Sequence, residues 1–145
     1  MMPDLSEPVR DALIAAAAIT SELPVYQGSY PIFTRVPVPD DAEYPLIVVG
    51  AQVQAGSEDG VSDERPVVVR DITVYGENTT AAKYRAVERA AHAIHAIFHR
   101  RRGSIIVPDW AVMNVTAVGP APAPVDNEQT VGRRVSVTFR LARQY

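Results

Sequence analysis

Residues 132–141 have the sequence GRRVSVTFRL, in which polar and apolar side chains alternate without a break from Arg134 to Leu141. Successive side chains of a strand point to opposite faces of a sheet, so this pattern predicts a strand with one buried and one polar face. We expect the sheet to be covered by other elements on one side only. The inward residues are Val135, Val137, Phe139 and Leu141, and the outward residues are Arg134, Ser136, Thr138 and Arg140.

A second alternating stretch, residues 66–76, leads into the longest helical pattern of the chain. Thr79 or Thr80 can cap this helix, because a threonine hydroxyl accepts a hydrogen bond from the first turn. The helix is expected to end at residues 100–102, with Gly103 in the left-handed position that often follows a helix. One apolar stripe runs along it, formed by Tyr84, Val87, Ala91, Ile94 and Phe98.

The remaining predicted elements are shorter. Ser6, followed by Glu7 and Pro8, is expected to cap a first helix that ends near residues 20–22, before Pro24. The order of elements predicts an α+β fold, with two helices packed on one face of a mostly antiparallel sheet of four to five strands. Beyond the two alternating stretches, strands or short extended pieces are expected at residues 25–26, 32–34, 46–49 and 110–118.

The composition limits the class of protein. The 145 residues are 47% hydrophobic and 21% charged, as expected for one globular domain over residues 1–145. The chain has no cysteine, which excludes disulfides and thiol nucleophiles. A net charge of -3 argues against a general nucleic-acid binder. The longest apolar run, residues 12–19, is far shorter than the ~20 residues that span a membrane, and no basic N-terminal signal region is present. We therefore expect a protein made in the cytoplasm, without a membrane partner.

His92, His95 and His99 lie with Glu88 along one stripe of the long predicted helix. The i, i+4 spacing is used by helical zinc sites, and a histidine strip can also respond to pH. The alternative is a half-exposed stripe beside the apolar face. One helix cannot close a site around an ion, and no second cysteine or histidine cluster exists, so we predict no metal and no cofactor.

Motifs for covalent catalysis are missing from the sequence. There is no nucleophile elbow and no glycine-rich phosphate loop. Asp109 and Asp126 sit in turn-like contexts that explain them without catalysis. We predict that the protein is not an enzyme and has no catalytic residues.

Two loops and one basic run are the candidate interaction surfaces. Residues 56–65 form a long predicted loop with one apolar residue, and we expect it to become ordered only against a partner. Residues 120–124 (PAPAP) predict a stiff extended link between the last two strands. Alternatively, the loops are tolerated insertions, and the arginines stabilise the negative C-terminal end of the helix or touch DNA in passing. The charged interface candidates are Glu58, Asp59, Asp63, Glu64, Arg100, Arg101 and Arg102.

The order and spacing of these pieces resemble the tail-terminator, or tail-completion, proteins of long-tailed bacteriophages and related tail-like particles. The resemblance covers residues 5–141, and its clearest pieces are residues 44–49 (YPLIVV), residues 71–75 (DITVY) before an alanine-rich helix, and residues 132–139 (GRRVSVTF). The acidic loop and the proline-rich link depart from the family pattern. The family has no catalytic residues to carry over.

The resemblance implies a structural virion protein at the interface of head and tail. Such a protein forms a ring, typically a hexamer, at the head-proximal end of the tail tube, where it stops tube polymerisation and offers a surface to the head. The implied partners are other copies of the chain, the tail tube protein and a head connector or stopper protein, with at most transient passage of DNA. The alternatives are another head–tail connector component, a stopper or adaptor, or more remotely a small ligand- or metal-binding module.

Overall fold

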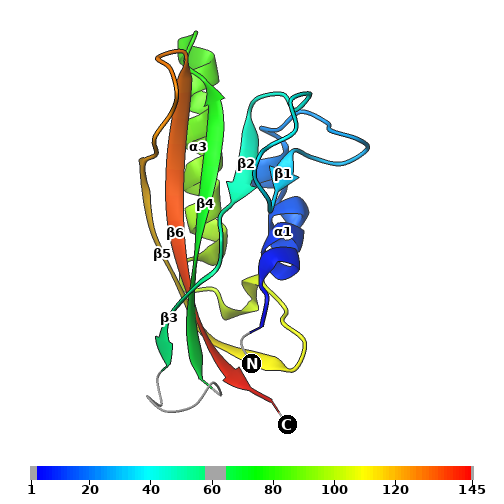
Figure 1. The fold of residues 1–145 in the computed structure, drawn as a ribbon, viewed down its shortest axis with the longest axis vertical. Helices are drawn as coiled ribbons and strands as arrows, with labels where there is room; N and C mark the ends of the chain where they lie inside the picture. Colours follow the sequence, from blue (N-terminus) through cyan, green and yellow to red (C-terminus); the bar gives the residue numbers. More distant parts are fainter. Residues whose placement is uncertain (1–2, 58–64, 145) are drawn as a thin grey trace.

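The computed structural model describes residues 3–57 and 65–144. The three longest strands all follow residue 65 of the chain, and helices pack beside them (Figure 1). The helices are α1 (Ser6–Ala15), α2 (Ala17–Thr20), α3 (Ala81–Phe98) and the 3-10 helix η1 (Arg102–Ser104). The strands are β1 (Ile32–Phe33), β2 (Leu46–Val49), β3 (Val53–Ser57), β4 (Pro66–Glu77), β5 (Trp110–Pro122) and β6 (Thr130–Arg143).

The strands form one sheet in the order β1-β2-β4-β6-β5, with β3 also paired to β4. Only the short β1–β2 pair is parallel, so the predicted α+β fold with a mostly antiparallel sheet is confirmed. The strand β3 was not predicted, because Gly56 and Ser57 were placed in the acidic loop. They pair instead with Val67 and Pro66, and β3 thereby supplies a partner for the half of β4 that β2 does not reach.

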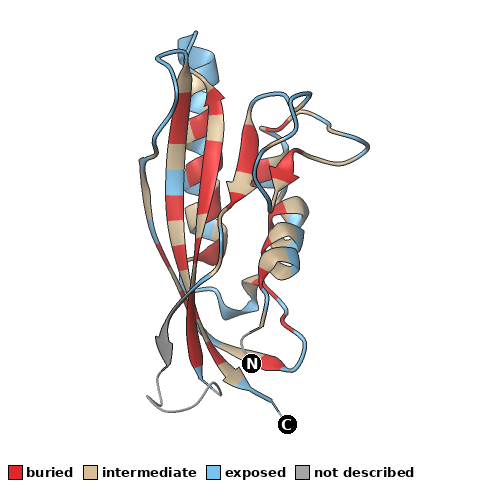
Figure 2. Ribbon diagram, in the orientation of Figure 1, coloured by how far each residue is buried: buried red, intermediate tan, exposed pale blue. Residues whose placement is uncertain are grey.

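The core lies between the sheet and the helices. Burial alternates along β6, with Val135, Val137, Phe139 and Leu141 buried as predicted (Figure 2). On α3, four residues of the predicted stripe are fully buried and Tyr84 packs at the margin. The rings of Phe98 and Phe139 meet edge to face with centroids 5.9 Å apart, which joins the end of α3 to the middle of β6. Helix α1 adds Val9 and Leu13 to the same cluster of buried side chains.

The opposite face of the sheet is polar at its centre. Asp71 and Ser136 are register partners on β4 and β6, and the Ser136 hydroxyl donates a 2.6 Å hydrogen bond to the Asp71 carboxylate. Thr73 lies on the same face of β4 and is 8% exposed. Thr73 is opposite Arg134 in the register, and a long arginine side chain covers neighbouring surface with its aliphatic stem.

The first helix starts and ends differently from the prediction. Ser6 is the first helical residue rather than the cap, and Leu5 holds the N-cap position without a side-chain bond. The Asp4 carboxylate accepts the backbone N–H of Ser6 at 2.9 Å and so serves one of the unpaired donors of the first turn. At Ala16 the backbone becomes extended, which divides the predicted helix into α1 and α2.

The long helix α3 begins as predicted and stops early. Thr80 is the N-cap, and its hydroxyl accepts the backbone N–H of Lys83 at 3.2 Å. The helix ends at Phe98, and Arg100 rather than Gly103 takes the left-handed conformation, with φ of 59°. Gly103 lies inside η1. The chain leaves the helix here because the Arg100 N–H donates to the Val115 carbonyl, 2.8 Å away on β5.

The proline-rich residues 120–124 are not simply a link, because β5 continues to Pro122. Proline is tolerated there since β5 is an edge strand, and one side of its backbone has no strand partner among the residues that the structure describes. The register with β6 shifts between Val118 and Ala121. Gly119 sits at this shift with φ of 116°, and a Cβ would lie 2.7 Å from the Arg134 carbonyl oxygen, so glycine is required.

Candidate functional site

The acidic half of the predicted interface falls outside the described residues. Glu58, Asp59, Asp63 and Glu64 all belong to residues 58–64. The structure therefore does not test whether they meet the arginines that follow α3. Their role in contacts between molecules stays a prediction.

The three arginines after α3 are exposed, and two of them take part in ending the helix. The backbone N–H of Arg100 donates a hydrogen bond to the Val115 carbonyl on β5. The Arg101 side chain turns back, and its Nε donates to the Ala96 carbonyl at 3.0 Å. A cation at this position donates a hydrogen bond to a terminal carbonyl and interacts favourably with the negative end of the helix dipole. Arg102 begins η1. The helix-end role thus accounts for Arg101, while contacts of this run with a partner remain a prediction.

The histidine stripe is divided among three environments. His92 is exposed, and its Nε2 lies 3.9 Å from a Glu88 carboxylate oxygen. The rings of His95 and His99 stack with centroids 4.8 Å apart. The Nδ1 of His99 accepts the backbone N–H of Ala117 at 3.1 Å, so this nitrogen carries a lone pair rather than a proton. In the part of the chain that the structure describes, no three histidine, aspartate or glutamate side chains are gathered as for a metal.

Glu88 instead joins a cluster that the sequence analysis missed. The Arg133 guanidinium on β6 donates to both the Glu88 carboxylate and the Tyr84 hydroxyl, and its carbon lies 5.5 Å from the centre of the Tyr84 ring. Burial opposes the charge, but the hydrogen bond and the charge of Glu88 outweigh it and raise the pKa of Arg133. The sequence contains a signal for this cluster, because residue 133 has the same inward parity as Val135 and residues 84 and 88 lie on one side of α3.

A second missed cluster surrounds Arg70, an inward-facing residue of β4 that is 2% exposed. Its Nη1 lies 3.2 Å from the Ser6 hydroxyl, 3.3 Å from the Gln52 side-chain oxygen Oε1 and 3.6 Å from the Asp4 carboxylate. Gln52 in turn accepts the Leu5 N–H and donates to the Pro3 carbonyl. Burial, its largest influence, lowers the pKa of Arg70, and Asp4 partly offsets this. The cluster fastens residues 3–6 to the sheet.

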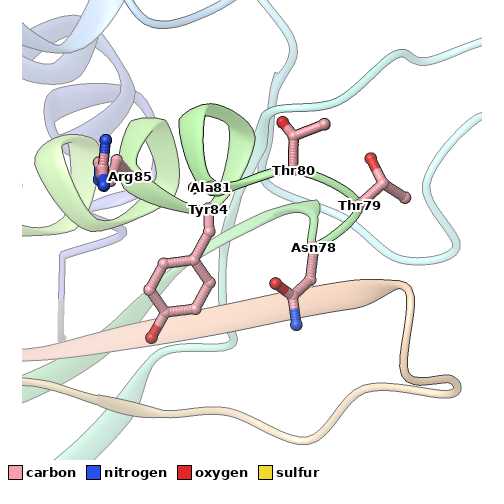
Figure 3. A pocket seen from close by; sticks show the side chains of 6 residues that line it. All are labelled: Asn78, Thr79, Thr80, Ala81, Tyr84 and Arg85. Carbon is pink, nitrogen blue, oxygen red and sulfur yellow. The ribbon is translucent and has the colours of Figure 1, made fainter.

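A hollow of about 560 Å³ lies at the N-terminal end of α3. Figure 3 shows the side chains that line it. Tyr84 points from α3 toward β6, whereas Arg85 points away from it (Figure 3). The Thr80 hydroxyl already caps the helix, and the Asn78 backbone N–H donates to the Gln129 carbonyl at 2.7 Å. These groups serve the turn between β4 and α3, so they do not form a nucleophile with an adjacent base. The hollow is lined by Asn78, Thr79, Thr80, Ala81, Tyr84 and Arg85.

Comparison with known proteins gives a likeness of fold. No protein-family model matches the sequence, and no curated protein matches it either. Among solved structures, the chain is similar to a chain of the virion of a native gene transfer agent (GTA) particle, with a TM-score of 0.72. The similarity covers 95% of this chain and 94% of the other chain at 17% sequence identity. The two proteins therefore share a fold along nearly their whole lengths.

None of the described helices is both long and apolar enough to cross a membrane.

Proposed function

We propose that this chain is a structural component of a virion and acts there as a tail terminator. In this role, copies of the chain form a ring at the head-proximal end of the tail tube, stop its polymerisation and offer a surface to the head. The observation that carries the proposal is the fold shared with a chain of the gene transfer agent virion, over 95% of this protein. The order of the sequence segments, which resembles that of tail terminators, supports the same conclusion.

The arrangement of elements is compatible with a protein that works through surfaces. Buried side chains form one cluster between the helices and the sheet, and the other face of the sheet has a polar centre. The charged clusters around Arg70 and Arg133 fasten elements to one another. A structural role without catalysis agrees with these features, and it needs neither a cofactor nor a metal.

A ring requires two different complementary patches on each subunit, because every neighbour contact is head-to-tail. We propose that one patch contains the four acidic residues of the segment 58–64 and that the other contains the three arginines of residues 100–102. Opposite charges favour association and fix its direction. The further partners are the tail tube protein, a head connector or stopper protein, and DNA in transit.

Removing the protein from its own particle tests the proposed function. Without a terminator, tail tubes should grow beyond their normal length and remain unjoined to heads. Tubes of normal length that fail to join heads would instead indicate a stopper or adaptor. Joined particles in normal numbers would contradict both roles.

Replacing residues 58–64 with a short glycine-rich turn tests the acidic patch. The free energy of unfolding should change by no more than about 0.5 kcal/mol, because a segment with four carboxylates and one apolar side chain can add little to the core. The variant should nevertheless fail to restore joined particles. Restoration to wild-type numbers would show that the loop is a tolerated insertion.

A further inference from the structure

The outer edge of β5 is unusual for its composition. Within residues 3–57 and 65–144, β6 is the only strand that pairs with β5, so one side of the β5 backbone has no strand neighbour there. The 13 residues of β5 include no charged side chain. Natural proteins protect such edges with charges, prolines, bulges or a covering segment, since free backbone groups can pair with another chain. Prolines 120 and 122 protect one end of β5, and a register irregularity between Val112 and Asn114 disturbs the strand near its other end. The middle of β5 needs another device.

The end of α3 covers the middle of this edge. The Arg100 N–H donates to the Val115 carbonyl at 2.8 Å, and the Ala117 N–H donates to His99 Nδ1 at 3.1 Å. Residues 115 and 117 are two positions apart, so their backbone groups have the same orientation in the strand. Because β6 lies on the other side, these contacts use backbone groups that an added strand would need.

The covering turn is anchored on one side and charged on the other. Phe98 precedes it and is fully buried, while the His99 ring stacks on His95. Arg100 adopts the left-handed conformation, which is sterically unfavourable for a non-glycine residue, and the bond to Val115 helps to hold it there. Arg101 and Arg102 follow directly. Two copies that met edge to edge would bring these cations together.

We propose that the turn formed by His99 and Arg100, here termed the edge guard, keeps β5 from pairing with β5 of a second copy of this chain. A second copy fits the uncovered edge, because antiparallel pairing about a twofold axis places no like charges opposite each other within two uncharged strands. The exposed side chains of Met113 and Val118 supply apolar surface for such a pair. This inference concerns a contact between two copies and does not depend on the tail-terminator role.

The absence of cysteine allows a clean test. Val118→Cys, at an exposed position of β5, introduces a single thiol, and a short bismaleimide joins two copies only when their β5 strands are adjacent. With the guard intact, cross-linked dimer should be scarce. His99→Ala removes one hydrogen-bond acceptor and should raise the dimer yield about two- to tenfold. Amide exchange at Ala117 should accelerate in parallel.

Matched variants distinguish loss of the edge guard from general destabilisation as the cause of a higher dimer yield. His99→Asn keeps an acceptor oxygen near the place of Nδ1 and should return the yield to the guarded level. His92→Ala, at an exposed site on the same helix, should leave it unchanged. Met113→Lys in the His99→Ala background should suppress the dimer, because a lysine on an edge strand opposes pairing.

Helix content by circular dichroism shows whether the variants remain folded. If His99→Ala unfolds, His99→Leu provides the test, since it fills a similar volume without an acceptor. A dimer yield that does not rise in a folded variant without the acceptor would overturn the proposal. An equally high yield in the guarded protein would do the same.

Discussion

Arg70 and Arg133 occupy inward positions of β4 and β6, where the alternating pattern otherwise places apolar side chains. Burying a guanidinium is costly unless partners replace its water, and each arginine has partners from a distant part of the chain. Arg133 meets Glu88 on α3, and Arg70 meets Ser6 and Gln52. The period of two predicts where both side chains point. It does not identify their partners, because those contacts depend on how the helices pack on the sheet.

Asp4 should give the N-terminal cluster a pH dependence. The Ser6 backbone N–H, then the Ser6 hydroxyl, and more weakly Arg70, hold the pKa of Asp4 below its usual value of 3.8, although slight burial opposes them. Because the folded-state pKa is the lower one, the stabilisation is present above pH 3.8 and is lost as the pH falls through the lowered value. Urea unfolding of wild type and Asp4→Asn between pH 6 and about 2.5 should show a stability difference that shrinks in acid. A difference that is independent of pH would contradict this role of Asp4.

At the scale of elements, the long periodic segments were predictable, and so were the short strands β1 and β2, whereas β3 and the ends of the helices were not. The strands β4 and β6 and the start of α3 were predicted correctly, because many residues of each repeat one pattern. The strand β3 was missed since it is short and contains Gly56, and its place depends on the half of β4 left without a neighbour. The end of α3 was misplaced because a contact with β5, rather than the local glycine, decides it.

Arg100→Gly should stabilise the protein. Glycine adopts the left-handed conformation without the steric cost borne by arginine, although it also increases the entropy of the unfolded chain. We expect a net gain of about 0.5–1 kcal/mol in the free energy of unfolding. Thermal denaturation should show it, and Arg102→Gly, in η1, serves as the control without this gain. A lower melting temperature for Arg100→Gly would argue against strain at this residue.

Val137→Asp tests which face of β6 is buried. Val137 is fully buried beneath α3, and an unpaired carboxylate there should leave the protein unfolded or insoluble. Thr138→Asp, one residue along and on the other face, should change the stability far less. Solubility and circular dichroism of the two variants provide the comparison. Equal effects would contradict the assignment of faces.

At the scale of the whole molecule, the fold class follows from the sequence and the assembly does not. Alternating strands and two amphipathic helices predict a sheet with one covered face, and the structure has this arrangement. Ring formation depends on contacts between subunits, and the periodicity of a single chain does not predict such contacts. The shared fold with a chain of the gene transfer agent virion therefore carries the proposal further than any residue pattern does.

Electron microscopy of the purified protein mixed with its tail tubes tests the central claim most directly. The account predicts rings of this protein, and one ring bound to a single end of each tube. Rings should also stop tube growth when they are added during polymerisation. Tubes that lengthen unchanged, with no protein bound at either end, would contradict the assignment as a tail terminator.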